Sequence, residues 1–286
     1  MRHRALIALV LSIVAVASVA LAQTPGVDDG TEEAIEPSPS SSALPTPSPS
    51  ASHVVVPLKD NMLLIPASRF TMGSNEPKAA PNEKPAHAAR ARSFWIDRTE
   101  VSVGSYRACV DAGHCAPPQK SSALCTYGLG DDQLPVSCVR WQDADAFCRA
   151  NGKRLPREAE WELAARGTGA QRFPWGSPIG CYYAATLLND NTARSCTGRR
   201  PAHVGSYPMG ASPFGVLDMA GNVEEWTADW YAEHVGSGVR PTAGASHVMR
   251  GGGWLSRPID SRTSARDWGS ALEAGPNVGF RCAKDP

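Results

Sequence analysis

From Val204 the chain reads VGSYPMGASPFGVLDMAGNVEEWTADWY, and from Val248 it reads VMRGGGWLSRPIDSRTSARDW, before GFRC at 279–282. Three earlier segments belong with these stretches: RFTMGS at 69–74, SFWIDRTEVS at 93–102 and NGKRLPREAEWELAARG at 151–167. The motifs RLPREAEWE and DMAGNVEEW are long enough to be specific, and the order of the segments along the chain is part of the same pattern. Together they decide the fold of this chain.

These segments resemble the formylglycine-generating enzyme family, whose domains are also called sulfatase-modifying factor domains. The resemblance covers nearly all of residues 54–286 and implies an irregular α+β fold, similar to C-type lectin-like domains. In such a loop-rich fold, disulfides and bound ions can fix the long loops. Roughly 230 residues are enough for one substantial core, so we expect a single domain of this kind over 54–286.

The chain begins with a segment typical of an export signal. A basic start at 2–4 precedes an apolar run at 5–22, which ends in the small-x-small cleavage site Ala20-Leu21-Ala22. We therefore expect residues 1–22 to be a cleaved signal peptide, which makes the protein secreted, periplasmic or attached to the cell surface. The alternative is an uncleaved membrane anchor, because the apolar run is just long enough to span a bilayer.

Residues 23–53 contain PSPSSSALPTPSPSAS and almost nothing that a core could bury. Such Pro/Ser-rich sequence favours extended, solvated conformations, so we interpret it as a disordered linker that holds the domain away from a membrane or wall. The chain has 28 basic and 28 acidic residues. This balance argues against a nucleic-acid partner and against a broad patch for anionic membranes.

Eight cysteines follow the linker, and none of them forms a C-x-x-C motif. This pattern favours disulfides in an oxidising compartment over a zinc ribbon or a thioredoxin-like redox site. The family resemblance implies one specific pair, Cys148 with Cys282. The other six allow 15 connectivities, and local pairing would give Cys109–Cys115, Cys125–Cys138 and Cys181–Cys196.

Local signals place three helices and one strand pair. Ser102 is a suitable cap for a helix that ends at Gly113, a second helix is expected over 141–150, and a third begins at Pro156 and ends at Gly167. The apolar residues 54–64 are expected to pair with 70–73 through a turn. In the third helix the charged residues are expected to form ion pairs around a core tryptophan rather than to act as catalysts. The charged residues are Arg154, Glu158, Glu160 and Arg166, and the tryptophan is Trp161.

The enzymes of the family oxidise a sulfatase cysteine with copper held by two cysteines, which lie shortly after an RGGSW-like turn. Here the first of these positions falls at Ser256 and the second near Asp260 or Ser261, and no cysteine occurs between Cys196 and Cys282. Copper(I) prefers soft thiolate ligands, which a serine hydroxyl does not replace. We therefore expect neither copper binding nor copper-dependent oxidation, and we assign no catalytic residue.

The family resemblance also implies a structural calcium ion at the loop GNVEEW. Its ligands here would be the Asn222 side-chain oxygen, the Val223 carbonyl and the Glu225 carboxylate, which are the hard oxygen donors that calcium requires. The alternative is a plain turn, in which Asn222 takes a left-handed conformation and Glu225 is solvated.

The groove that receives an extended peptide in the enzymes should remain. The resemblance places Trp254, Ser256, Arg266 and Arg281 along it, where arginines and a tryptophan could bind a peptide, a carboxylate or a sugar face. The alternative is that these residues form the packed floor of the domain.

The sequence therefore favours a secreted binding or assembly module that lacks copper oxidase activity. Its expected partner is a peptide, a protein or a glycan at the cell surface or in the periplasm, with a membrane only if the signal stays uncleaved. One alternative is an oxidoreductase that makes formylglycine, or that catalyses another reaction in the same groove. The other is lectin-like sugar binding through the calcium loop, which rests on the fold alone.

Overall fold

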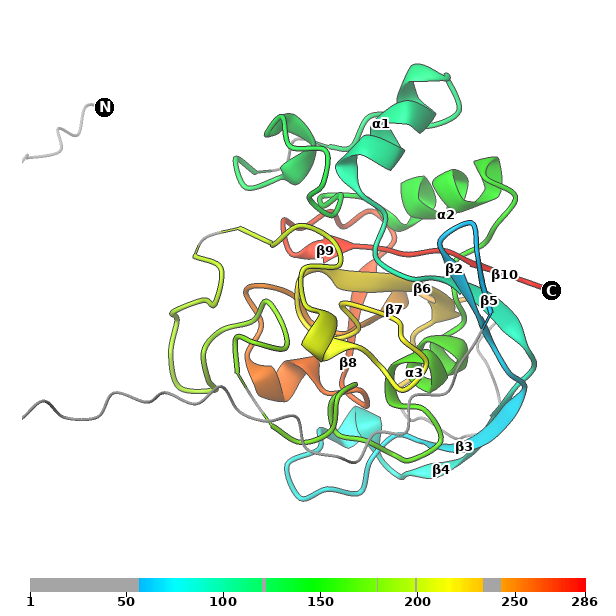
Figure 1. Cartoon of the computed structure of the whole chain (residues 1–286), viewed down its shortest axis with the longest axis vertical. Coiled ribbons are helices and arrows are strands. Elements are labelled where there is room, and N and C mark those ends of the chain that lie inside the picture. Colours follow the sequence, from blue (N-terminus) through cyan, green and yellow to red (C-terminus); the bar gives the residue numbers. More distant parts are fainter. Residues whose placement is uncertain (1–56, 120–121, 179, 199, 234–242) are drawn as a thin grey trace, which may run out of the picture. The chain divides into compact units, whose positions relative to one another are not determined.

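The computed structural model describes residues 57–119, 122–178, 180–198, 200–233 and 243–286 (Figure 1). The predicted signal peptide at 1–22 and the predicted linker at 23–53 lie outside these residues. Within the described part of the chain, no helix has both the length and the apolar character needed to cross a membrane.

Short elements and long connections make up the described residues. The α-helices are α1 (Val103–Asp111), α2 (Trp141–Ala150) and α3 (Glu158–Arg166). The strands are β1 (Leu58–Lys59), β2 (Met62–Ile65), β3 (Ser68–Met72), β4 (His87–Ala91), β5 (Phe94–Asp97), β6 (Glu224–Trp230), β7 (Ser246–Arg250), β8 (Arg266–Ser270), β9 (Val278–Gly279) and β10 (Ala283–Lys284). Single turns of 3₁₀ helix lie at Pro81–Glu83, Thr126–Gly128, Pro208–Gly210 and Pro258–Ser261. The predicted loop-rich α+β class is confirmed.

The strands form three separate sheets. Their orders are β1-β2-β5-β10, β3-β4 and β8-β7-β6-β9, and only the β6–β9 pair is parallel. The expected pairing of 54–64 with 70–73 was wrong, because β2 pairs with β5 and β3 pairs with β4. The reason is packing: Phe94 and Ile96 of β5 are fully buried and supply the apolar face that Leu63 and Ile65 need.

The helices begin and end close to the predicted residues. The Ser102 hydroxyl accepts the Ser105 N–H at 3.2 Å and caps α1, and α2 spans the predicted range. Helix α3 begins at Glu158, two residues later than expected, because Arg157 is still extended and acts as its cap. The Glu160 carboxylate accepts the Arg157 N–H at 2.9 Å, and Gly167 ends the helix with φ of 64°.

Helix α3 is the central scaffold element, because it contacts β3, β4, β6 and β7. Its charges form the expected ion pairs. Arg154 binds Glu160 at 2.7 Å, and the Arg250 guanidinium lies 5.4 Å from the centre of the buried Trp161 ring. Helices α1 and α2 contact each other and carry a second apolar cluster around Tyr106, together with β6 and the C-terminal segment (Figure 1).

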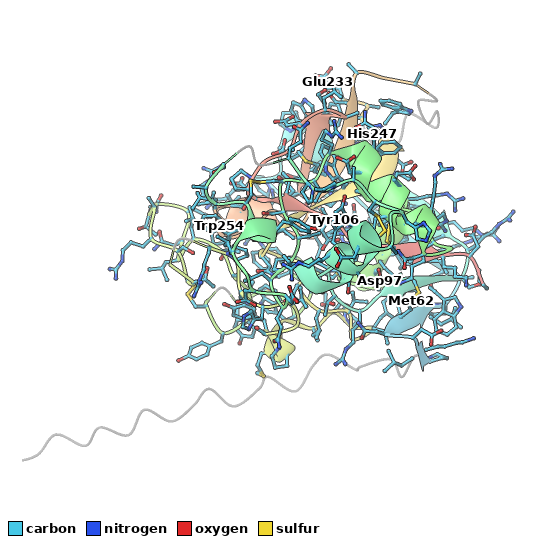
Figure 2. The ribbon with its side chains drawn as sticks, turned by 90° about the horizontal axis from the view of Figure 1, so that it is seen from above. Met62, Asp97, Tyr106, Glu233, His247 and Trp254 are labelled. Carbon is cyan, nitrogen blue, oxygen red and sulfur yellow. A yellow bond between two sulfur atoms is a disulfide. The ribbon has the colours of Figure 1, made fainter. Side chains whose placement is uncertain are left out.

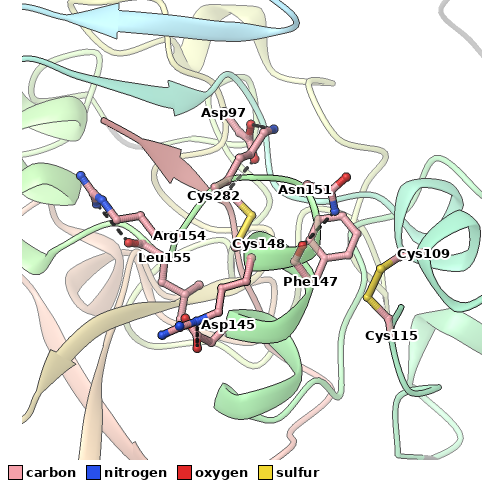
Figure 3. Close-up of a disulfide and its surroundings, with 12 residues drawn as sticks. Asp97, Cys109, Cys115, Asp145, Phe147, Cys148, Asn151, Arg154, Leu155 and Cys282 are labelled. Atoms are coloured by element: carbon pink, nitrogen blue, oxygen red, sulfur yellow. Dashed lines mark hydrogen bonds and ion pairs between the residues drawn. A yellow bond between two sulfur atoms is a disulfide. The ribbon is translucent and has the colours of Figure 1, made fainter. Parts of the chain in front are cut away.

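All eight cysteines are paired. The bond Cys148–Cys282 joins α2 to the C-terminal segment across 134 residues (Figure 3). In the chain-entropy model, closing a loop of that length stabilises the folded state by about 5 kcal/mol. The other bonds are the expected local ones: Cys109–Cys115, Cys125–Cys138 and Cys181–Cys196. Such a bond network suits a loop-rich domain in an oxidising compartment.

Candidate functional site: an acidic groove beside a glycine turn

An open groove of about 1010 Å³ lies between β6, β8 and the turn that follows β7. Its walls include short polar segments at 80–83 and 190–191 and the 3₁₀ turn at Pro258–Ser261. This volume lies at the upper end of the range common for ligand sites. The side chains that bear on its chemistry are Glu224, Ser256, Asp260, Arg266, Asp267 and Trp268.

The glycine turn brings Ser256 and Ser261 to the same place. Both have an atom within 3.0 Å of the point where a Cβ on Gly252 would lie, and the φ of Gly252 is 59°. The Ser256 hydroxyl accepts the Gly253 N–H at 2.9 Å and the Asn277 side-chain N–H at 3.3 Å. Ser261 is buried, and its hydroxyl donates to a main-chain carbonyl. These two positions therefore hold hard, hydrogen-bonded hydroxyls, which do not fit copper(I).

Glu224 is the buried acid of the groove. It begins β6, and strand alternation sends its side chain and that of Glu225 to opposite faces of the sheet. Glu224 is only 8% exposed, yet no described residue donates a hydrogen bond to its carboxylate or forms an ion pair with it. Burial, reinforced by Asp267 and Asp260, raises the pKa of Glu224 well above its usual range. Its oxygens are not among the fully enclosed side-chain atoms that lack a partner, so the carboxylate opens into the groove. An acid with a pKa perturbed in this way, in a groove, is a functional candidate.

The arginines of the groove are already neutralised. Arg257 binds Asp260 through two contacts of 2.7 and 3.0 Å, and Arg262 binds Glu83 through two of 2.7 and 2.9 Å. Arg266 is likewise held by both carboxylate oxygens of Glu158, at 2.6 and 3.1 Å. None of these guanidinium groups compensates Glu224 or Asp267.

An aromatic pair forms another part of the groove wall, on the face of β8 opposite Asp267. The rings of Tyr231 and Trp268 stack with centroids 4.4 Å apart, and Trp268 is 46% exposed. Both residues line the groove. A stacked pair of this kind offers a flat apolar face and a π surface to a ligand.

Comparison with known proteins places this geometry in a family. A family model described as "Sulfatase-modifying factor enzyme 1-like domain" matches residues 49–286. The chain belongs to this family. It is 30% identical to the formylglycine-generating enzyme of Mus musculus, over 78% of this chain and 75% of that protein. It is 31% identical to the Streptomyces coelicolor enzyme of the same name, over 77% of this chain and 88% of that protein.

The solved structure of PvdO from Pseudomonas aeruginosa has a similar fold. It superposes with a TM-score of 0.67 at 28% identity, covering 79% of this chain and 94% of that one. The family assignment made from the six sequence segments is therefore confirmed.

Two residues that the family resemblance placed along the groove lie elsewhere. Trp254, labelled in Figure 2, is only 1% exposed, and its indole N–H donates to the Pro276 carbonyl at 3.3 Å. Arg281 is completely buried. Only Ser256 and Arg266 of the four predicted residues line the groove. The alternative, in which these residues form the packed floor of the domain, therefore describes Trp254 and Arg281. The sequence does not show the partners that bury them.

The predicted calcium ligands do not form a shared site. Arg281 binds both carboxylate oxygens of Glu225 at 2.7 Å, and the Trp161 indole N–H donates to the same group at 2.9 Å. The Asn222 side-chain oxygen instead accepts a main-chain N–H at 2.9 Å, and Val223 is buried. The set therefore does not fit calcium. Asn222 does take the left-handed conformation of the alternative, with φ of 62°, but Glu225 is buried rather than solvated.

Sequence reasoning missed Glu224 and Asp267. One signal was present: Glu224 and Glu225 are consecutive in a strand, so their side chains must point to opposite faces of the sheet. Nothing in the local sequence tells which of the two faces the core, because that depends on the distant Arg281.

Proposed function

We propose that this chain is an exported ligand-binding member of the family that does not oxidise cysteine with copper. The observation that carries the proposal is the pair of serines beside Gly252: the family resemblance puts the first copper cysteine at Ser256 and the second near Asp260 or Ser261. All eight cysteines of the chain are in disulfides, so no thiol is left to replace them.

The groove supports a binding role. It is open and lined by segments distant in sequence, and an extended peptide, a protein loop or a glycan would fit along it. Its walls are stiffened by ion pairs within the domain, such as Arg262–Glu83, so the site is largely preformed. We place the protein outside the cytoplasm, on a Pro/Ser-rich spacer, because its disulfides suit an oxidising compartment.

A conversion assay tests the proposal against the oxidoreductase alternative. The full chain is incubated with copper under mild reduction and a peptide carrying a Cys-x-Pro-x-Arg motif, and mass spectrometry follows the thiol. We expect no aldehyde, while a cysteine oxidase from the family run in parallel converts the peptide. Formation of aldehyde by this chain would overturn the proposal and establish the oxidoreductase.

A paired substitution checks the position of the serines. Ser256→Cys combined with Ser261→Cys places two thiols beside Gly252, and we expect this variant to bind copper(I). The single Ser256→Cys variant is the control, because one thiol provides only half of the soft ligand pair. Failure of the double variant to bind copper would show that these serines do not occupy the copper positions.

A further inference from the structure

We infer that the groove binds an organic cation, an ammonium or guanidinium group, between Glu224 and Asp267. The inference deepens the proposed binding function by naming the chemistry of the ligand, which we take to be a lysine or arginine side chain of an extended peptide.

The sheet register places both acids on one face. Asp267 of β8 lies opposite Met249 of β7, and Met249 lies opposite Trp226 of β6. Residues directly opposite one another share a face, and so do residues two apart on one strand. Glu224 precedes Trp226 by two residues and therefore faces the same side as Asp267. Both acids line the groove.

The two acids have no ion-pair partner among the residues that the structure describes. Glu224 is more than nine-tenths buried and has no hydrogen-bond or ion-pair partner among the described residues. Asp267 accepts only the Trp268 main-chain N–H, at 2.8 Å. The neighbouring arginines are each bound to another carboxylate. A ligand cation would supply the missing compensation for a buried carboxylate.

The ligand is better described as an organic cation than as a metal ion. Among the described residues, no three histidine, cysteine or acidic side chains come close enough to share one metal ion. Ammonium and guanidinium groups instead carry several N–H donors, which can bridge carboxylates set further apart.

The shape of the site favours a side chain carried by a peptide. The groove is open rather than closed, and the exposed side chain of Leu255 offers a further apolar contact on its wall. A free amine would use only the acidic end of such a groove. A peptide would also use the walls.

The experiment measures binding of small probes to the full chain by tryptophan fluorescence and calorimetry. The probes are blocked Ala-Lys-Ala and Ala-Arg-Ala tripeptides, the same tripeptide with norleucine, and n-butylammonium, which is the lysine side chain without a backbone. We expect both basic peptides to bind at least tenfold more tightly than the norleucine peptide and to weaken as salt is raised. If n-butylammonium binds more weakly than the lysine peptide, the ligand is a side chain carried by a peptide. If the two bind equally, the cation site is confirmed, but its ligand is a free amine.

Substitutions assign the site. Glu224→Gln should weaken the lysine peptide at least tenfold and leave the melting temperature equal or higher, because it removes an unpaired buried charge. Asp267→Asn should weaken it less, since Asp267 is exposed. Glu76→Gln, the same change at an exposed acid outside the groove, should bind as the original chain does.

Two results would overturn the inference. Equal binding of the lysine and norleucine peptides would remove the cation site and leave peptide binding itself intact. If none of the probes binds, the proposed cation site is also contradicted. Failure of the proposed function is seen separately, as aldehyde formation in the conversion assay.

Discussion

Arg281 and Glu225 form a two-contact ion pair that is completely buried, with both N–O distances at 2.7 Å. Arg281 also donates to the carbonyls of Asp97 and Leu217, at 3.1 and 2.9 Å. The pair therefore joins β6 and the segment before β10 to the end of β5 and to the loop at Leu217. Burying both charges is affordable only because each has its full set of partners.

Breaking this pair should destabilise the domain severely. In Arg281→Met the Glu225 carboxylate stays buried with only the Trp161 indole as a partner, so we expect a loss of about 3–5 kcal/mol in the free energy of unfolding. Urea denaturation measures it. The control is Arg149→Met, which removes an exposed pair with Asp145 and should cost less than about 1 kcal/mol. Similar losses in the two variants would show that the Arg281 pair is not a central support.

Calcium should have no effect on stability. Because Glu225 is bound by Arg281 and the Asn222 oxygen by a main-chain N–H, calcium binding at this loop would first have to break those contacts. We expect the same melting temperature in chelator and in millimolar calcium, measured by differential scanning calorimetry. A clear rise with calcium would reinstate the ligand set predicted from the sequence.

The sequence predicted what local signals encode. Ser102, Pro156 and Gly167 placed helix ends within two residues, and close spacing of cysteines gave the local disulfides. Cys148–Cys282 came from the family resemblance, since spacing alone says nothing about two cysteines 134 residues apart.

Long-range partners were the part that could not be predicted. The family resemblance placed Arg281 in the groove, and the sequence does not show that its partner, Glu225, lies 56 residues earlier in the chain. Likewise, the choice between Glu224 and Glu225 as the core residue depends on which one meets Arg281. The groove acid was therefore visible only once the sheet register was known.

Gly252 should not tolerate a side chain. A Cβ there would lie 2.6 Å from the Ser261 hydroxyl oxygen and 3.0 Å from the Ser256 Cβ, and its φ of 59° disfavours other residues. We expect Gly252→Ala to lower the free energy of unfolding by about 1–3 kcal/mol. The control is Gly128→Ala, at a glycine whose Cβ would meet no atom within 4 Å. Denaturant titration of both variants compares them, and an equal effect would mean that the turn can relax.

Protonation of His247 should make the domain acid-sensitive. Its ring lies between the indoles of Trp141 and Trp230, with both centroid distances at 3.8 Å, and burial lowers its pKa from 6.5 to about 4. Between these values the unfolded chain binds a proton that the folded chain does not. Stability is therefore complete above about pH 6.5 and falls as the pH drops toward 4, by up to about 3 kcal/mol.

Thermal melting between pH 4 and 8 tests this origin of the acid sensitivity. His247→Phe keeps an aromatic ring in the stack but cannot bind a proton, so we expect its stability to fall less steeply with acid than that of the original chain. His114→Phe, the same change at an exposed histidine, should retain the original slope. If the slope in His247→Phe matched that of the original chain, the acid sensitivity would have to come from other groups, because only the variant lacks the titrating ring between the two tryptophans.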